Sequence, residues 1–90
     1  MSNEQQFKSA AEAVKNLVSR PSNDELLELY ALYKQATVGD NETKRPGMLN
    51  IKERAKWDAW SNQKGTACDS AMENYTNLVD SLKDQYGSKS

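Results

Sequence analysis

The 90-residue sequence contains no histidine and a single cysteine, Cys68. Without histidine, the chain has no imidazole that could act as a general base or bind zinc or haem. One cysteine excludes an internal disulfide framework and a thiolate-rich metal cluster, and Cys68 is interpreted as an incidental free thiol. No nucleophile motif accompanies it. The composition therefore argues against an enzyme and against a metalloprotein.

Long apolar runs and an excess of one charge are also missing. No stretch approaches the roughly 20 apolar residues of a membrane-spanning helix, and the first residues lack the features of a secretory signal. The chain is therefore expected to stay soluble in the cytoplasm. Twelve basic and thirteen acidic residues leave a net charge of −1, which argues against a general nucleic-acid binder. With 37% hydrophobic residues, residues 1–90 are expected to form one domain with a modest core.

Four segments show the hydrophobic periodicity of helices, which predicts an all-α bundle. The helices are expected at residues 3–18, 22–38, 51–63 and 67–86. The apolar residues of the first and fourth segments form single stripes roughly 120° wide. Those of the second spread over roughly 220°, so this helix is predicted to be central or to face both a core and a ligand. The third has the least clear pattern, with Ile51, Ala55 and Ala59 in a thin stripe and Trp57 and Trp60 pointing elsewhere.

Several residues suggest where these helices begin and end. Ser22 and Glu25 form a capping-box pattern at the start of the second helix, and Thr66, with Asp69 as a weaker partner, is predicted to cap the fourth. Gly87 is expected to end the fourth helix. The loop at residues 39–49 is long for a joint in a small bundle, which makes it a candidate for function.

Basic and aromatic residues lie close together in the middle of the chain. Residues 44–56 hold five basic residues against one acidic residue, Glu53, and so carry a net charge of +4. Tyr30, Tyr33 and Lys34 project from one face of the second helix, an arrangement that suits a ligand with a phosphate and a flat ring. The alternative is that both tyrosines belong to the core and that the charges form a solvated face. Periodicity alone leaves both interpretations open.

Three blocks of sequence favour the first interpretation. Residues 30–40 (YALYKQATVGD), 45–49 (RPGML) and 56–60 (KWDAW) resemble the signature of the acyl-CoA-binding protein family. Lys64-Gly65, Ala71-Met72 and Tyr75 follow in matching order, and the match runs from about residue 7 to residue 87. The chain is thereby identified as a member of this family.

The resemblance implies a four-helix, up-down-down-up bundle that binds long-chain fatty acyl-CoA one-to-one. It implies an intracellular carrier, buffer and pool former, acting as a monomer without catalysis, cofactor or metal, in transient contact with membranes or with enzymes that use acyl-CoA. Tyr30, Lys34 and Lys56 match the residues that hold the CoA 3′-phosphate. Tyr33 matches a residue beside the adenine, and Lys15 a residue that assists the head group.

The resemblance also implies further ligand contacts and a site for the acyl chain. Ala31, Leu32 and Tyr75 fall at further ligand-binding positions. The acyl chain is expected in an apolar groove between the first two helices, with Phe7, Ala11 and Leu27 as candidate walls.

The sequence departs from the usual family pattern at Asn50-Ile51 and Glu53, outside the matched phosphate set. Two alternatives of other classes remain. One is a helical protein-interaction module or a precursor of signalling peptides. The other is a domain from a larger enzyme, which Met1 and the short tail after Gly87 disfavour.

Overall fold

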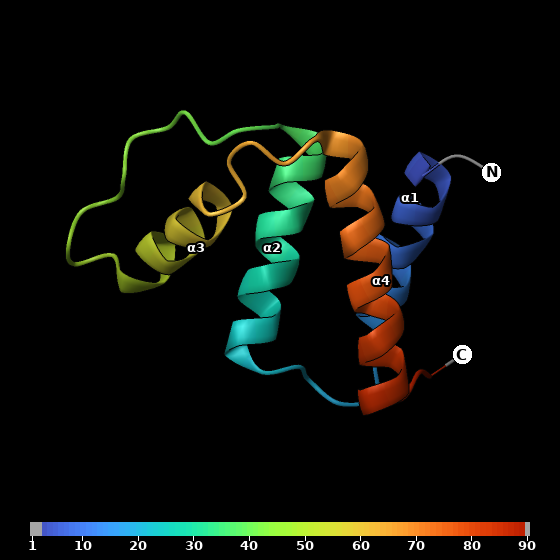
Figure 1. Cartoon of the computed structure of the whole chain (residues 1–90). Helices are drawn as coiled ribbons and strands as arrows, with labels where there is room; N and C mark the ends of the chain where they lie inside the picture. The colour runs from blue at the N-terminus through green and yellow to red at the C-terminus, as the bar shows by residue number, and fades with distance from the viewer. Residues whose placement is uncertain (1–2, 90) are drawn as a thin grey trace.

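Four α-helices and one turn of 3-10 helix form the fold in the computed structural model, which describes residues 3–89. The elements are α1 (Asn3–Ala13), η1 (Val14–Asn16), α2 (Asn23–Thr37), α3 (Ile51–Ser61) and α4 (Cys68–Tyr86). α1 and α4 run in one direction while α2 and α3 run in the other (Figure 1). The predicted all-α bundle with up-down-down-up helices is thus confirmed.

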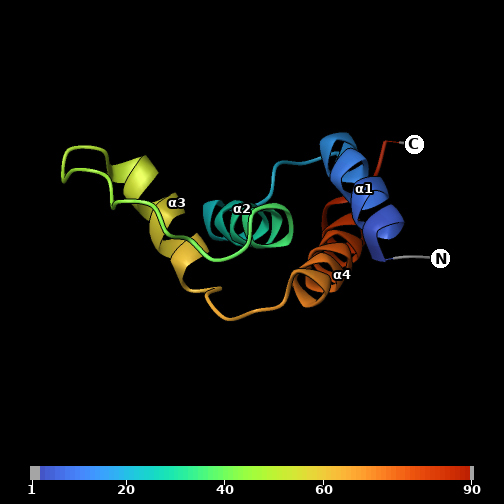
Figure 2. The same ribbon diagram turned by 90° about the horizontal axis from the view of Figure 1, so that it is seen from above.

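The helices lie nearly in one layer, and the molecule measures 39 × 28 × 15 Å along its principal axes. Seen from above, α3 comes first, followed by α2, and α4 and α1 lie at the other end (Figure 2). α2 contacts α3 on one side and α4 on the other, and α4 also contacts α1. The central position predicted for the second helix is therefore confirmed, and its broad apolar arc serves two neighbours.

The main core lies where α1, α2 and α4 meet. It contains Phe7, Ala10, Leu17, Leu29, Leu32, Ala36, Ala71, Tyr75, Val79 and Leu82. Four of these come from the predicted stripe of α4, which repeats every three to four residues and so turns a single face toward α1 and α2. Burying this stripe is the main source of stability in so small a domain.

The first helix ends earlier than expected. α1 stops at Ala13, η1 adds one tight turn, and the backbone of Leu17 is extended. The reason lies in the other end of the chain: the Val18 amide donates to the Gly87 carbonyl at 3.0 Å, and the Lys89 amide donates to the Asn16 carbonyl at 2.8 Å. These bonds occupy the Val18 amide and the Asn16 carbonyl, which a continued helix would have paired within itself. They hold the start of the α1–α2 connection against the end of α4.

The predicted cap at the start of α2 is confirmed, whereas the one predicted for the start of α4 is wrong. The Ser22 side chain accepts from the Glu25 amide, and the Glu25 side chain accepts from the Ser22 amide, which completes the capping box. Thr66 does not cap α4; Ala67 is the capping residue, without a side-chain bond, and the Thr66 hydroxyl donates to Gln63 instead. Gly87 ends α4 as expected, with a positive φ of 80°.

The long loop before α3 is held by both tryptophans. The Trp60 indole donates to the Gly39 carbonyl at 2.8 Å, and the Trp57 indole donates to the Thr43 carbonyl at 3.1 Å. Trp60 is the buried residue of α3, whereas Ile51, at one end of the predicted stripe, is exposed. Side-chain hydrogen bonds, rather than an apolar stripe, therefore fix the loop on α3.

Candidate functional site

Two grooves run along the two sides of α2. The first lies between η1, which continues α1, and α2, with Tyr75 of α4 beside it, and we call it the α1–α2 groove. It has a volume of about 320 Å³ and is lined by Val14, Lys15, Pro21, Leu26, Leu29, Tyr30, Tyr33 and Tyr75. The α2–α3 groove has a volume of about 430 Å³ and is lined by Arg20, Asn23, Leu26, Leu27, Tyr30, Ile51, Lys52, Ala55 and Lys56. Leu26 and Tyr30 belong to both linings. One ligand lying across Tyr30 can therefore reach both grooves.

The α2–α3 groove combines an apolar floor with cations at its rim. Leu26, Leu27 and Ala55 supply apolar surface from α2 and α3. Two cationic side chains, Lys52 and Lys56, are four residues apart and so lie on the same face of α3. Such a groove suits a molecule with an apolar portion and a phosphate at one end.

Lys56 and Lys34 lie along the seam between α2 and α3. The Lys56 Nζ is 5.6 Å from the centroid of the Tyr30 ring, and the Lys34 Nζ is 5.0 Å from that of Trp60. Lys34 follows Tyr30 by one helical turn. The structure thus gathers the three residues predicted to hold a phosphate, and aromatic faces support both ammonium groups.

Two of the predicted cations, Lys56 and Lys15, each have a carboxylate partner three residues earlier in the chain. Lys56 lies 3.7 Å from Glu53, and Lys15 lies 3.3 Å from Glu12. These pairs are solvent-exposed, so each contributes little to stability. A phosphate approaching either lysine would compete with a carboxylate that is easily displaced.

Three aromatic rings stand beside the α1–α2 groove. Phe7 lies 5.4 Å from Tyr33 and 5.0 Å from Tyr75, and the Tyr33 and Tyr75 centroids are 6.0 Å apart. Tyr33 is exposed, whereas Tyr75 is buried in the core. Burial, with a smaller effect from Tyr33, raises the pKa of Tyr75, so its hydroxyl keeps its proton. The exposed Tyr33 ring therefore packs against two buried rings, those of Phe7 and Tyr75, and Tyr75 also lines the groove.

The structure places some predicted site residues outside the grooves. Ala31 and Leu32 are buried, and Leu32 packs in the core, so their side chains do not line either groove. Phe7 and Ala11 also pack in or against the core. Leu27 lines the α2–α3 groove, not the groove between the first two helices where it was expected. Of these three candidate walls, only Leu27 therefore lines a groove, and that groove lies between α2 and α3.

Sequence reasoning missed several groove residues. The spacing of Lys52 and Lys56 predicts that they share one face of the third helix, but it does not indicate that this face borders a groove. Arg20 and Asn23 carry no such signal: Arg20 lies in the connection before α2, and Asn23 is the first residue of that helix. Ile51 was assigned to a stripe rather than to a groove.

A further hollow, between α1 and α4, has a different character. Its volume is about 430 Å³, and amide and hydroxyl side chains make up much of its lining. Its lysine, Lys83, lies 3.7 Å from Asp80, and no aromatic ring borders it. It lacks the pairing of apolar surface with cations that marks the two grooves beside α2.

Residues 3–89 show neither a membrane-spanning helix nor a cluster of metal-binding side chains. None of these helices is both long and apolar enough to cross a bilayer. Over the same residues, no three side chains of the His, Cys, Asp or Glu types are grouped so that they could hold a metal ion. The grooves are thus the features to compare with known proteins.

A family model described as "Acyl CoA binding protein" matches residues 4–79. The chain is 55% identical over 84 residues to the acyl-CoA-binding protein of Saccharomyces cerevisiae, covering 93% of this chain and 97% of that one. It is 52% identical over 82 residues to the acyl-CoA-binding protein homolog of Drosophila melanogaster, covering 91% and 95%. The crystal structure of Oryza sativa Acyl-CoA-Binding Protein 2 superimposes with a TM-score of 0.89 at 43% identity, covering 92% and 90%.

Proposed function

This chain belongs to the acyl-CoA-binding protein family, and from that premise we propose that it binds long-chain fatty acyl-CoA one-to-one. The observation that carries the proposal is the position of Tyr30 between two grooves, with Lys15 in one and Lys56 in the other. A ligand with a charged head and an apolar tail would meet cations and apolar surface together there. The chain carries no histidine base, and we propose carriage rather than catalysis.

The head group would lie over the seam between α2 and α3. Lys56 and Lys34 would donate charge-assisted hydrogen bonds to the 3′-phosphate, and the Tyr30 hydroxyl would donate a third. Tyr33 exposes a ring against which adenine could stack, and Lys15 would approach the head group from the α1 side. The support is geometric, since these side chains border the same surface on either side of Tyr30.

The acyl chain would lie in the α2–α3 groove. Leu26, Leu27 and Ala55 give this groove apolar surface, and its volume of about 430 Å³ exceeds the about 320 Å³ of the α1–α2 groove. Each buried CH₂ contributes about 0.8 kcal/mol of transfer free energy. The roughly 14 CH₂ groups of a sixteen-carbon acyl chain would therefore contribute at most about 11 kcal/mol, reduced by the ordering of the chain and of the side chains around it. The tail would supply affinity and the phosphate would supply specificity.

Isothermal titration calorimetry with palmitoyl-CoA, free CoA and palmitate tests the proposal, with palmitoyl-CoA kept below its micelle concentration. We expect one site per chain, with far tighter binding of palmitoyl-CoA than of free CoA. Palmitate should bind weakly because it lacks the phosphate. Equal binding of palmitate and palmitoyl-CoA would overturn the proposal. No binding by folded protein would favour a protein-interaction module instead.

The proposed role follows from tight, reversible binding. A protein that covers most of the apolar tail would keep acyl-CoA out of micelles and bilayers and would buffer its free concentration. It would work as a monomer in the cytoplasm and deliver its ligand to enzymes or membranes. Adding the protein to an acyl-CoA-consuming enzyme should lower the free substrate concentration in proportion to the protein added.

A further inference from the structure

We propose that the tip of the loop before α3 docks onto anionic lipid bilayers. In this arrangement Met48, Leu49 and Ile51 insert among the lipids, and Lys44 and Lys52 bind the phosphate head groups. We call these three apolar residues the apolar tip. The docking goes beyond the proposed function and is argued only from the residues of this surface. A role of the docking in loading acyl-CoA would rest on the proposed function.

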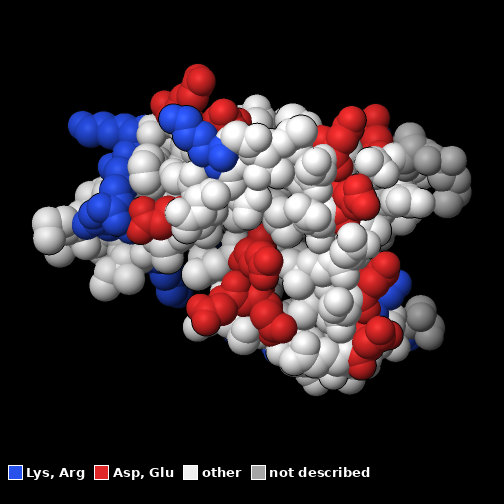
Figure 3. All heavy atoms as spheres, in the orientation of Figure 1, with Lys and Arg blue, Asp and Glu red and all other residues white. Residues whose placement is uncertain are grey.

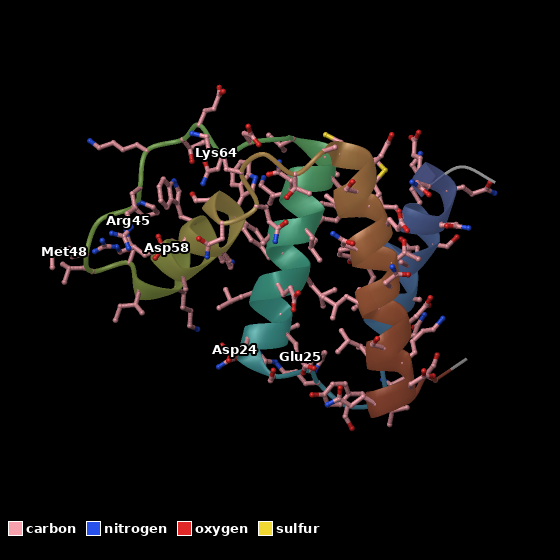
Figure 4. The ribbon with its side chains drawn as sticks, in the orientation of Figure 1. Asp24, Glu25, Arg45, Met48, Asp58 and Lys64 are labelled. Carbon is pink, nitrogen blue, oxygen red and sulfur yellow. The ribbon has the colours of Figure 1, made fainter. Side chains whose placement is uncertain are left out.

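The apolar tip is the most exposed group of large hydrophobic side chains in residues 3–89. Leu49 is 96% exposed, Met48 81% and Ile51 77%. Figure 4 shows Met48 at the outermost point of the loop, pointing away from the helices. Scattered exposed apolar residues are ordinary, but three within four positions at one projecting end mark an interaction surface.

The chain holds this tip in an extended position. The Asn50 amide donates to the Gly47 carbonyl at 3.0 Å, which closes a turn with Met48 and Leu49 at its corner. Behind the turn, Arg45 makes a two-pronged pair with Asp58 at 3.1 and 2.8 Å. The apolar side chains therefore project from a fastened loop.

The charges around the tip favour an anionic partner. Lys and Arg gather at the end of the molecule where the loop and α3 lie, while acidic side chains are spread over the whole of the same face, that end included (Figure 3). Lys44 and Lys52 are both exposed. The acidic neighbours are Glu42, Glu53 and Asp58, and Asp58 forms a salt bridge with Arg45. The first turn of α3 also starts here, and no side-chain bond from Asn50 caps it, so its partial positive charge adds to the basic side chains.

The shape of the surface favours a bilayer over a folded protein. A convex tip with basic flanks matches the pattern by which proteins enter the interface between head groups and acyl chains. Ile51 and Lys52 also line the α2–α3 groove, so the docked tip would bring one end of that groove to the lipid surface. An acyl chain could then pass between bilayer and groove with little exposure to water.

The test is co-sedimentation of the ligand-free, full-length protein with sucrose-loaded vesicles. One set contains phosphatidylcholine alone, and the other also contains phosphatidylserine. The variant is Met48→Ser with Leu49→Ser, because neither residue lines a groove or packs in the core. The control is Val18→Ser, which removes an exposed apolar side chain in the connection between η1 and α2.

We expect binding to the phosphatidylserine vesicles that weakens with added salt, and a loss of about tenfold or more in the double variant but not in the control. Absence of binding by the wild-type protein, equal binding to neutral vesicles, or equal binding by the double variant would each overturn the proposal. Palmitoyl-CoA titrations in solution should be the same for all three proteins. The vesicle experiment therefore tests the docking separately from acyl-CoA binding, which the titrations test.

Discussion

Replacing Lys56 with Ala should weaken acyl-CoA binding tenfold to thirtyfold while leaving the fold intact. The Lys56 Nζ lies over Tyr30, where the phosphate is proposed to bind. A hydrogen bond to a charged group contributes about 1.5–3 kcal/mol. Because the Lys56 side chain is 45% exposed, we take the lower part of that range, about 1.5–2 kcal/mol, which gives the stated change in Kd. Losing the exposed pair with Glu53 should change the free energy of unfolding by less than about 1 kcal/mol.

The assay is calorimetric titration of Lys56→Ala with palmitoyl-CoA, alongside urea denaturation. Lys8→Ala is a matched control, since Lys8 also pairs with a glutamate in its own helix, Glu4 at 3.3 Å, but lines neither groove. It should bind like the wild type. An unchanged Kd in Lys56→Ala would refute the phosphate assignment. A lost fold in the same variant would show that this lysine is structural.

Three further predictions follow from the contacts. Glu53→Gln removes the carboxylate that competes for Lys56, so the same titration should show binding about two- to threefold tighter at low salt and a smaller gain at high salt. Val79→Ala empties part of the core at a fully buried position and should cost about 2 kcal/mol in urea denaturation. A hydrogen bond from Tyr86 lowers the pKa of Glu25 in the folded protein. The ionised carboxylate therefore stabilises the fold above the unfolded pKa of about 4.3, and this contribution is lost as the pH falls through the lower folded pKa. Acid denaturation of Glu25→Gln should therefore show a smaller loss of unfolding free energy than that of the wild type.

Hydrophobic periodicity predicted a helix well where the helix buries a single apolar face in the core. The stripe of α4 repeats at helical spacing, and its residues Ala71, Tyr75, Val79 and Leu82 are all buried. The capping box at Ser22 also needs only residues that lie close in sequence. In both cases the physical cause is contained within one helix, so the sequence alone was sufficient.

Predictions failed where distant segments decide the outcome. The end of α1 depends on backbone bonds between residues 16–18 and 87–89, which no local pattern reveals. The third helix depends on Trp60, whose indole reaches back to Gly39 across the long loop. Trp60 could not be assigned to an apolar stripe, because its role is a hydrogen bond to a loop carbonyl as well as burial.

The candidate site could be predicted in part. Tyr30, Lys34 and Lys56 matched family positions, and the structure brings them to one seam. Ala31 and Leu32 lie within the same block, but successive residues of a helix point about 100° apart, so neighbours of a ligand-facing residue turn inward. The groove walls depend on how α3 packs on α2, which the sequence pattern did not define.

The central claim is that acyl-CoA binds across Tyr30, with its tail between α2 and α3. Titrating ¹⁵N-labelled protein with palmitoyl-CoA and mapping the amide shifts tests this most directly. The account predicts large shifts at Leu27, Tyr30, Ala55 and Lys56, and saturation at one ligand per chain. Shifts concentrated instead along the hollow between α1 and α4 would contradict it.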